Sequence, residues 1–256
     1  MIHTIGAIDF FLELDLQKIN KQNEETTTYI CCMQNIVVFT GAGISAESGL
    51  GTFRDSGGLW ENYKIEDVAT LEAFQNNPSL VLDFYNIRRK QLLDSSPNNA
   101  HIVLNKLQEK FNVSIITQNI DDLHERSSNV DVLHLHGKLR EARSTIDNKI
   151  YTIQGTDLNI GDLCEKGGQL RPNVVWFGED VPNMEIAIQK VMQSDIFIII
   201  GTSLNVYPAA SLINYATKAK RIILIDPKSL SYDGIEVICE KATKAVPKLV
   251  NELLYL

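Results

Sequence analysis

The chain has 256 residues, of which 44% are hydrophobic, so it is long enough for a full α/β core, as one domain or as one domain with an insert. A net charge of -8 argues against unaided nucleic-acid binding and mildly favours basic partners such as lysine-rich peptides. No apolar run reaches the about 18 residues of a membrane span, and Asp9, Glu13 and Asp15 interrupt any signal peptide.

The N-terminal 33 residues differ from the rest of the chain. The pattern from Ile8 to Ile19 predicts a short amphipathic helix, and residues 20–28 form a polar linker. Met33 stands just before the first apolar run, so residues 1–33 are expected to be an extension that the fold does not require. The four cysteines, Cys31, Cys32, Cys164 and Cys239, have unpatterned spacings, which indicates a reducing, cytoplasmic compartment.

The β-branched run of residues 36–40 (IVVFT) predicts a buried parallel strand that opens into a glycine loop, residues 41–46 (GAGISA). Glycines in such a loop let the backbone approach an anionic ligand closely. The alternative is a tight strand-to-helix turn without a ligand. An ordinary dehydrogenase unit is disfavoured, because residues 48–58 are too rich in glycine for a long helix. This polar loop, with Phe53 and Arg54 inside it, is more typical of a mobile cover over a ligand.

Residues 60–90 have helical periodicity with a break at Asn77-Pro78, where a new helix is expected to start. In the second helix Tyr85 and Arg88 are three positions apart and share a face. The residues alone favour the simpler interpretation, in which residues 88–90 (RRK) are a solvated helix end. His101 is expected to belong to a further helix start and its packing.

Several later apolar runs end in glycine or in a polar side chain. They are Val113–Thr117, Leu133–Leu135, Asn173–Phe177, Ile196–Ile200 and Arg221–Ile225. In an open parallel sheet the carboxyl ends of the strands border the ligand crevice. So many polar endings at one edge indicate a binding site there.

Six ordered motifs then resemble the sirtuin family of NAD-dependent protein-lysine deacylases. They are GAGIS (41–45), TFR (52–54), TQNID (117–121), HG (136–137), RPNVVWFGE (171–179) and GTS (201–203). The resemblance covers the chain from about Gln34 to the C-terminus. It implies a catalytic domain over residues 34–256, with a Rossmann-like parallel sheet, helices on both faces, and a small lobe from inserts at about 52–96 and 138–170.

The family's reaction implies that an acyl group leaves a lysine side chain and that nicotinamide and O-acyl-ADP-ribose are formed. His136 would be the base, which suits an imidazole whose ordinary pKa is about 6.5. Asn119 and Asp121 would hold the nicotinamide carboxamide, Asn119 also acting in catalysis, and Gln118 would hold the ribose. His134 should face the other side of the strand and be structural. No nucleic acid or membrane partner is implied, and a monomer is expected.

The other NAD-binding residues implied by the resemblance lie in the glycine loops, the cover loop and the C-terminal part. They are Gly41, Ala42, Gly43, Ser45, Thr52, Phe53, Arg54, Trp60, Ile120, Gly201, Thr202, Ser203, Asp226 and Ala242. Two glycine loops, a first at residues 41–45 and a second at residues 201–203, would cradle the phosphates through backbone N–H groups. The peptide substrate would lie as a strand between Val175, Phe177, Gly178 and Glu179 on one side and Asn205, Val206 and Tyr207 on the other.

Tyr85 and Arg88 match the Tyr-x-x-Arg pair of the sirtuin class that removes succinyl and malonyl groups, so acidic acyl groups are expected beside acetyl. The chain departs from the family at Gly51, where proline is usual, at Asp226, where asparagine is usual, and before Ala242, where glycine is common. Sirtuins usually also carry zinc-binding C-x-x-C pairs.

Of the zinc-binding C-x-x-C pairs that sirtuins usually carry, only Cys164 remains in this chain. Ser144, Asp147 and Gly167 stand at the other matching positions. No zinc is therefore expected. An apolar series is expected to form a small hydrophobic substitute, made of Ile146, Ile150, Tyr151, Ile153, Leu158, Ile160 and Leu163. A sirtuin-like mono-ADP-ribosyltransferase and a catalytically silent NAD-binding module remain the alternatives, although intact His136, Asn119 and Asp121 weigh against silence.

Overall fold

The computed structural model describes residues 33–51, 63–228 and 233–255. The chain divides into two units, residues 1–34 and 35–256, and all the described helices and strands belong to the second. The helix predicted over residues 8–19 and the cover-loop residues Thr52, Phe53, Arg54 and Trp60 lie outside the described residues. No described helix is both long enough and apolar enough to pass through a membrane.

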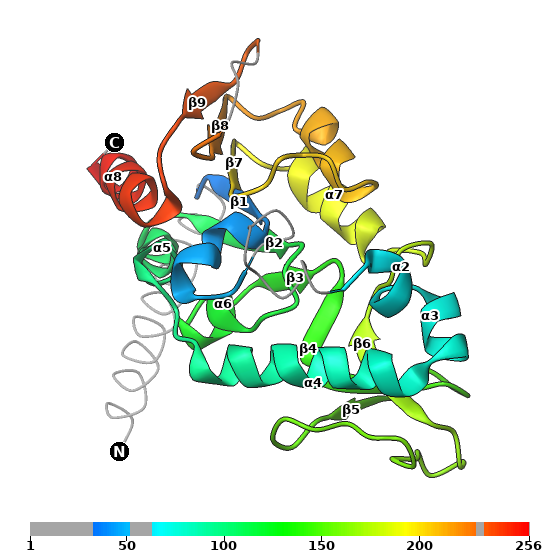
Figure 1. The fold of residues 1–256 in the computed structure, drawn as a ribbon. Helices are drawn as coiled ribbons and strands as arrows, with labels where there is room; N and C mark the ends of the chain where they lie inside the picture. Colours follow the sequence, from blue (N-terminus) through cyan, green and yellow to red (C-terminus); the bar gives the residue numbers. More distant parts are fainter. Residues whose placement is uncertain (1–32, 52–62, 229–232, 256) are drawn as a thin grey trace, which may run out of the picture. The chain divides into compact units, whose positions relative to one another are not determined.

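A parallel sheet forms the centre of the second unit, with the strand order β3-β2-β1-β7-β8-β9 (Figure 1). Its strands are β1 (Asn35–Thr40), β2 (Asn112–Thr117), β3 (Val132–His134), β7 (Ile196–Ile200), β8 (Arg221–Ile225) and β9 (Glu236–Ile238). The predicted strand over 36–40 lies at the middle of the sheet, because β1 pairs with both β2 and β7.

The described helices surround this sheet and a smaller one. The α-helices are α2 (Ile65–Val68), α3 (Leu71–Asn76), α4 (Pro78–Asp94), α5 (Asn99–Leu104), α6 (Leu123–Arg126), α7 (Met184–Met192) and α8 (Ala242–Tyr255). The 3₁₀ helices are η1 (Ala42–Ile44), η2 (Ala46–Ser48), η4 (Asn105–Glu109) and η5 (Ala209–Tyr215).

Alternation along β1 produces a hydrophobic core on each face of the large sheet. Ile36 and Val38 pack in the core that α5 and α8 cover, whereas Val37 and Phe39 pack in the core of α7 and η5. Figure 1 shows α5 and α8 on one side of the sheet and α7 on the other. Successive side chains of a strand point to opposite faces, so a run that is apolar throughout requires cover on both. The predicted Rossmann-like sheet with helices on both faces is confirmed.

A second sheet is antiparallel and has the order β5-β4-β6, with β4 (Gly137–Ser144), β5 (Ile150–Thr152) and β6 (Leu170–Val174). Helix α4 runs alongside it (Figure 1). The two predicted inserts share a hydrophobic core, which includes Phe84 from α4 and Ala142 from β4. The prediction that Asn173–Phe177 is a parallel strand is wrong: β6 ends at Val174 and pairs with β4, so this run does not end at the crevice edge of the large sheet.

The start of α4 follows the sequence signals closely. Asn77 caps it by accepting a hydrogen bond from the Leu80 amide at 3.2 Å, and Pro78 occupies the first turn. The interpretation of residues 88–90 as a solvated helix end is wrong, because α4 continues to Asp94 and Arg89 is fully buried. Arg89 donates to the carbonyls of Leu139 (2.8 Å) and Thr156, which ties α4 to the small sheet.

We predict that a chain beginning at Met33 keeps the activity and the thermal midpoint of the full chain. The reason is that every described core element and every predicted site residue follows this position. Activity and thermal unfolding of the two chains, compared side by side, check this. A clear loss of either would show that the N-terminal extension stabilises the core.

Candidate active site

The loops after β1 and β7 meet so closely that glycine is required in both. A Cβ added to Gly43 would lie 2.7 Å from Gly201 Cα, and one added to Gly201 would lie 2.4 Å from the Ile44 nitrogen. Gly201 also has a φ of +62°, which side chains disfavour. Glycine at these positions therefore allows the two loops to pack into one surface at the carboxyl edge of the sheet.

This packing uses many of the amides that were expected to cradle phosphates. The amides of Gly41, Gly43, Ser45 and Gly201 all donate to carbonyls of the protein, as does that of Ile44. Within the described chain, no hydrogen bond occupies the amides of Ala42, Thr202 and Ser203. The expected cradle is thus narrower than the motifs imply.

Ser45 joins the first glycine loop to the polar segment that follows β2. Its hydroxyl donates to Asp121 Oδ2 at 3.0 Å and lies 3.1 Å from Asn119 Nδ2, which donates to it. Asn119 and Asp121 are both buried, and burial raises the pKa of Asp121 although the Leu123 amide and the Ser45 hydroxyl oppose the shift. The three side chains form a compact group of one hydroxyl, one amide and one carboxyl, which together offer hydrogen-bond donors and acceptors of the kind that a carboxamide can pair with.

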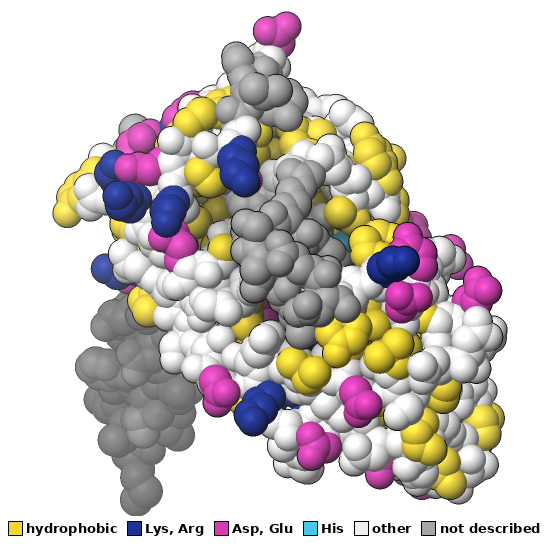
Figure 2. Space-filling model, viewed as in Figure 1, with side chains coloured by type: hydrophobic (Ala, Val, Ile, Leu, Met, Phe, Trp, Pro, Cys, Tyr) yellow, Lys and Arg dark blue, Asp and Glu magenta, His cyan; other side chains and the backbone are white. Residues whose placement is uncertain are grey.

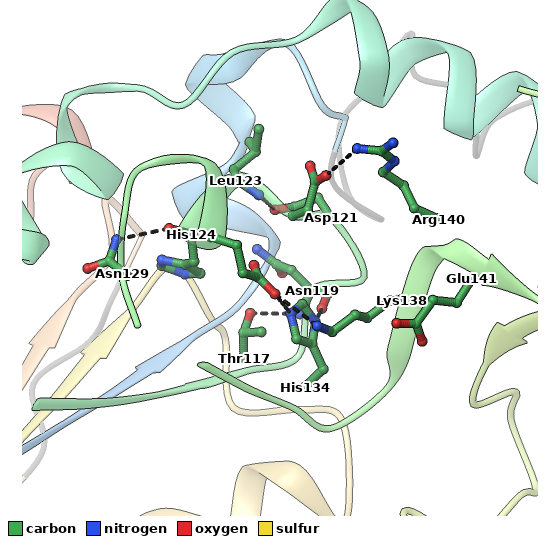
Figure 3. Close-up of polar contacts among 12 residues, drawn as sticks. Thr117, Asn119, Asp121, Leu123, His124, Asn129, His134, Lys138, Arg140 and Glu141 are labelled. Carbon is green, nitrogen blue, oxygen red and sulfur yellow. Dashed lines mark hydrogen bonds and ion pairs between the residues drawn. The ribbon is translucent and has the colours of Figure 1, made fainter. Parts of the chain in front are cut away.

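The backbone of this segment is held on both sides (Figure 3). Thr117 Oγ1 accepts from the Asn119 amide at 3.0 Å. The Thr40 hydroxyl donates to the same oxygen at 2.8 Å. His134 lies 3.0 Å from the Asn119 carbonyl and 2.8 Å from Glu125 Oε1. His134 thus holds the backbone of the segment, as a structural residue would. The expectation that it faces away from His136 is wrong, because residues two apart on a strand share a face and both rings contact this segment.

His136 contacts the same segment one residue earlier. Its Nδ1 lies 3.0 Å from the Gln118 carbonyl. A carbonyl only accepts, so Nδ1 carries the proton and the neutral ring has its lone pair on Nε2. Burial lowers the pKa of His136, against the opposing effect of the Gln118 hydrogen bond, so the ring is neutral at pH 7. Gln118 also donates to Thr202 Oγ1 at 3.0 Å, which links this segment to the second glycine loop.

The backbone requires glycine directly after His136. Its φ is +80°, and a Cβ at this position would lie 2.0 Å from the Asn173 carbonyl oxygen. The backbone can therefore turn from β3 into β4 only with glycine there. The turn places His136 between the two sheets, and its carbonyl accepts from the Val175 amide at 3.0 Å.

Tyr85 and Arg88 lie on the inner side of α4. The Tyr85 side chain is buried, and its oxygen accepts a hydrogen bond from the Trp176 indole at 3.0 Å. The Arg88 guanidinium lies 5.8 Å from the centre of the Phe84 ring. Burial lowers the pKa of Arg88, whereas Tyr85 and Asp121 favour its charged form. Helix α4 shares a hydrophobic core with Ile120 and Leu123, so it packs beside the segment after β2.

The residues expected to flank a peptide are exposed, apart from two. Phe177, Val206 and Tyr207 present large apolar side chains to solvent. Glu179 is instead held inside: Arg171 binds both its oxygens at 2.7 and 2.9 Å, and Arg143 binds one at 2.8 Å. Val175 and Glu179 are the two that are only partly exposed. Because both arginines hold Glu179, it fixes the shape of its loop.

Asp226 lies beside the second glycine loop, whereas Ala242 shares a hydrophobic core with Ile44 of the first glycine loop. Asp226 follows β8, whose last carbonyl accepts from the Gly201 amide at 2.9 Å, and Ala242 is buried at the start of α8. The Asp226 carboxylate is partly exposed and accepts from the Lys228 amide at 2.8 Å through one oxygen. No hydrogen bond from the described residues reaches its other oxygen.

We expect Asp226 to favour NAD over NADP, because a carboxylate accepts from ribose hydroxyls and repels a 2′-phosphate. Asp226→Asn should narrow the difference between the dissociation constants of the two dinucleotides. Calorimetric titration of both variants with both dinucleotides measures this. Equal binding of NAD and NADP to the unaltered protein would contradict the role.

The positions that match the family's zinc cysteines still lie together. The Ser144 hydroxyl donates to Cys164 Sγ at 3.3 Å, and the Gly167 amide donates to the Cys164 carbonyl at 2.9 Å. Asp147 is paired with Lys166 at 3.0 Å. This set offers one sulfur and no imidazole, so it does not fit a structural zinc site. Across the described residues, no three His, Cys, Asp or Glu side chains are grouped for a metal.

The prediction that an apolar cluster replaces the zinc site is wrong. Ile153 and Leu158 are buried, but they belong to the core shared with α4. The other aliphatic members point to solvent, with more than half of each side chain exposed: Ile146, Ile150, Ile160 and Leu163. Hydrogen bonds and ion pairs such as Lys149–Glu165 (2.7 Å) hold the loops at this end.

We predict that the purified protein contains no stoichiometric zinc and that a chelator leaves its thermal midpoint unchanged. A tetrahedral structural site needs four N or S ligands, whereas this set offers a single cysteine. Elemental analysis and thermal unfolding with and without EDTA test the prediction. One zinc per chain, or unfolding by the chelator, would refute it.

Comparison with known proteins adds to this geometry. The Sir2 family matches residues 41–208, which include the glycine loops, the segment after β2, His136 and the exposed loops. The chain belongs to the Sir2 family. A relative from Bacteroides thetaiotaomicron, named NAD-dependent protein deacylase, is 48% identical over 231 residues, which are 87% of this chain and 99% of the relative.

Solved structures of Sir2 homologues agree with this assignment. A mutant bound to ADP-ribose has a TM-score of 0.80 at 37% identity, covering 91% of this chain and 98% of the other. A complex with NAD has a TM-score of 0.78 at 36% identity and covers 91% and 94% of the two chains. Asp226 and Ala242 lie beyond the residues that the family matches, so this match does not include them.

The sequence predicted no role for three residues that shape the site of this Sir2-family enzyme, although two of them stand in the motif at 171–179. They are Arg89, Arg171 and Trp176, each buried. Arg89 stands four positions after Tyr85, a spacing that places both on one helix face, and this signal was available. No local pattern reveals that Trp176 contacts Tyr85, because 91 positions separate them.

Proposed function

We propose that this protein removes acyl groups from protein lysine side chains with NAD, giving nicotinamide and O-acyl-ADP-ribose, and that it accepts succinyl and malonyl groups as well as acetyl. The observation that carries the proposal is the neutral His136. Its Nδ1–H is fixed on the Gln118 carbonyl, and Asn119 and Asp121 follow in the same segment. The names of the relatives and the cofactors in the Sir2 homologue structures support the reaction class.

The residues at the carboxyl edge of the sheet fit NAD. Asn119, Asp121 and Ser45 would hold its carboxamide, Gln118 its ribose, and the amides of Ala42, Thr202 and Ser203 its phosphates. NAD, when bound, supplies the ADP-ribose that accepts the acyl group. His136 Nε2 would take a proton from a ribose hydroxyl, which a neutral imidazole held by Nδ1–H is oriented to do.

A protein substrate fits the exposed loops better than a nucleic acid does. Phe177, Val206 and Tyr207 offer apolar contacts on either side of an extended peptide. On the face drawn in Figure 2, the described Lys and Arg side chains are scattered among Asp and Glu and form no broad basic area. The chain's net charge of -8 agrees with a lysine-bearing partner.

Incubating the protein with NAD and a panel of acetyl-, succinyl- and malonyl-lysine peptides tests the proposal. Mass spectrometry should show loss of the acyl group and formation of O-acyl-ADP-ribose, with higher kcat/KM for the acidic groups. ADP-ribose attached to protein, with the acyl-lysine unchanged, would instead indicate a mono-ADP-ribosyltransferase. No product with any peptide would indicate a binding module.

A further inference from the structure

Trp176 contacts the residue expected to read the acyl group. Its indole Nε1 lies 3.0 Å from the Tyr85 oxygen, and the two side chains are each 2% exposed. An indole nitrogen only donates, so the Tyr85 oxygen is the acceptor of this bond. The hydroxyl hydrogen of Tyr85 must therefore point elsewhere, and no acceptor among the described residues bonds it.

An ion-pair cluster holds the indole in place. The Arg171 guanidinium stacks on the Trp176 ring at 3.4 Å and is itself bound by both oxygens of Glu179. Glu179 Oε2 also accepts from the Trp176 amide at 2.8 Å, so ring and backbone are fixed by the same carboxylate. Phe74 also packs against the indole, with ring centres 5.4 Å apart.

We propose that Trp176 is a positioning residue for acyl specificity: its N–H occupies the Tyr85 oxygen and so directs the Tyr85 hydroxyl hydrogen, beside Arg88, toward the carboxylate of an acidic acyl group. This inference rests on the proposed acidic acyl preference. A hydroxyl rotates freely unless its oxygen is engaged, and an oriented donor loses less on binding than a free one. Trp176 thus prepares a donor and contacts no substrate itself.

The arrangement suits a carboxylate and not a methyl group. Burial raises the pKa of Tyr85. Arg88 and the hydrogen bond from Trp176 oppose this shift without cancelling it, so the phenol keeps its proton at neutral pH. Arg88 is three residues further along α4, on the same face. A guanidinium and a phenol donor one turn apart can bind the two oxygens of one carboxylate.

The test is Trp176→Phe, which removes the N–H and keeps an aromatic ring under Arg171. We expect its KM for a succinyl-lysine peptide to rise about threefold to tenfold, the range of one net hydrogen bond, with kcat within about twofold. The factor by which KM rises for the acetyl-lysine peptide should be at least three times smaller, because an acetyl group has no carboxylate for the Tyr85 hydroxyl to bind. In a Tyr85→Phe background the same substitution should change the succinyl KM by less than about twofold, because the group it orients is gone.

Phe74→Leu is the matched control, since it loosens the packing of Trp176 and leaves its N–H; its ratio of succinyl to acetyl KM should equal that of the unaltered protein. Thermal midpoints verify that each variant is folded. Equal KM increases for both peptides, or an undiminished effect in the Tyr85→Phe background, would overturn the inference. An unaltered protein without any preference for succinyl-lysine would instead overturn the acidic acyl preference on which the inference rests.

Discussion

His136→Ala should reduce kcat for deacylation by about 10²- to 10⁴-fold, the usual cost of removing a general base. The structure gives the reason: Nδ1–H is held by the Gln118 carbonyl at 3.0 Å, which leaves Nε2 as the basic atom. NAD binding should largely persist, because Ser45, Asn119 and Asp121 keep their own hydrogen bonds. Steady-state kinetics and NAD titration by calorimetry measure the two effects separately.

His136→Asn is the matched control, because its amide can still donate to the Gln118 carbonyl but cannot act as a base. Both variants should be equally inactive if the base is what matters. Near-normal turnover in either would end the assignment of His136. Restored activity in the asparagine variant alone would show that the histidine only positions the loop after β2.

The pH dependence of the unaltered protein should report the same group. Burial lowers the pKa of His136 below its ordinary value of about 6.5, and the neutral ring is the active form. Activity is therefore present above the lowered pKa and is lost as pH falls through it. The acid limb of kcat/KM against pH should have its midpoint below 6.5. A midpoint above that value would contradict the assignment.

Arg88→Ala should raise KM for succinyl-lysine by about 10- to 100-fold, since a hydrogen bond to a charged group contributes about 1.5–3 kcal/mol. The effect on acetyl-lysine should be much smaller, because an acetyl group has no carboxylate to bind. Arg88 is partly buried, and Tyr85 and Asp121 favour its charged form, so a cation lies one helical turn from the Tyr85 hydroxyl. Kinetics with the two peptides on the two variants measure the difference.

Lys90→Ala removes a cation from an exposed position of the same helix and should leave both KM values unchanged. Arg88→Lys should fall between the arginine and alanine proteins for succinyl-lysine, because an ammonium keeps the charge but not the bidentate fork. Equal losses for both substrates in Arg88→Ala would mean that Arg88 stabilises α4 and reads no acyl group.

Local signals in the sequence were enough to predict the main sheet and the gathering of polar residues at its edge. The apolar run at 36–40 predicted the central strand, and Asn77-Pro78 predicted the start of α4. The polar residues after β2 and β7 were predicted to gather, and Gln118 does bond Thr202. These features depend on periodicity, turn residues and the shared direction of parallel strands, all of which a sequence displays.

Only the tertiary structure decided the features that depend on distant partners. From the sequence, Arg89 was predicted to be solvated, but in the fold it donates to the carbonyls of Leu139 and Thr156. Residues 173–177 were predicted to be a parallel strand, but β6 pairs with β4 in an antiparallel sheet. Trp176 is buried, and its contact with Tyr85 is one of these features. Its effect on Tyr85 arises because packing brings together side chains 91 positions apart, and hydrogen-bond direction then follows from that contact.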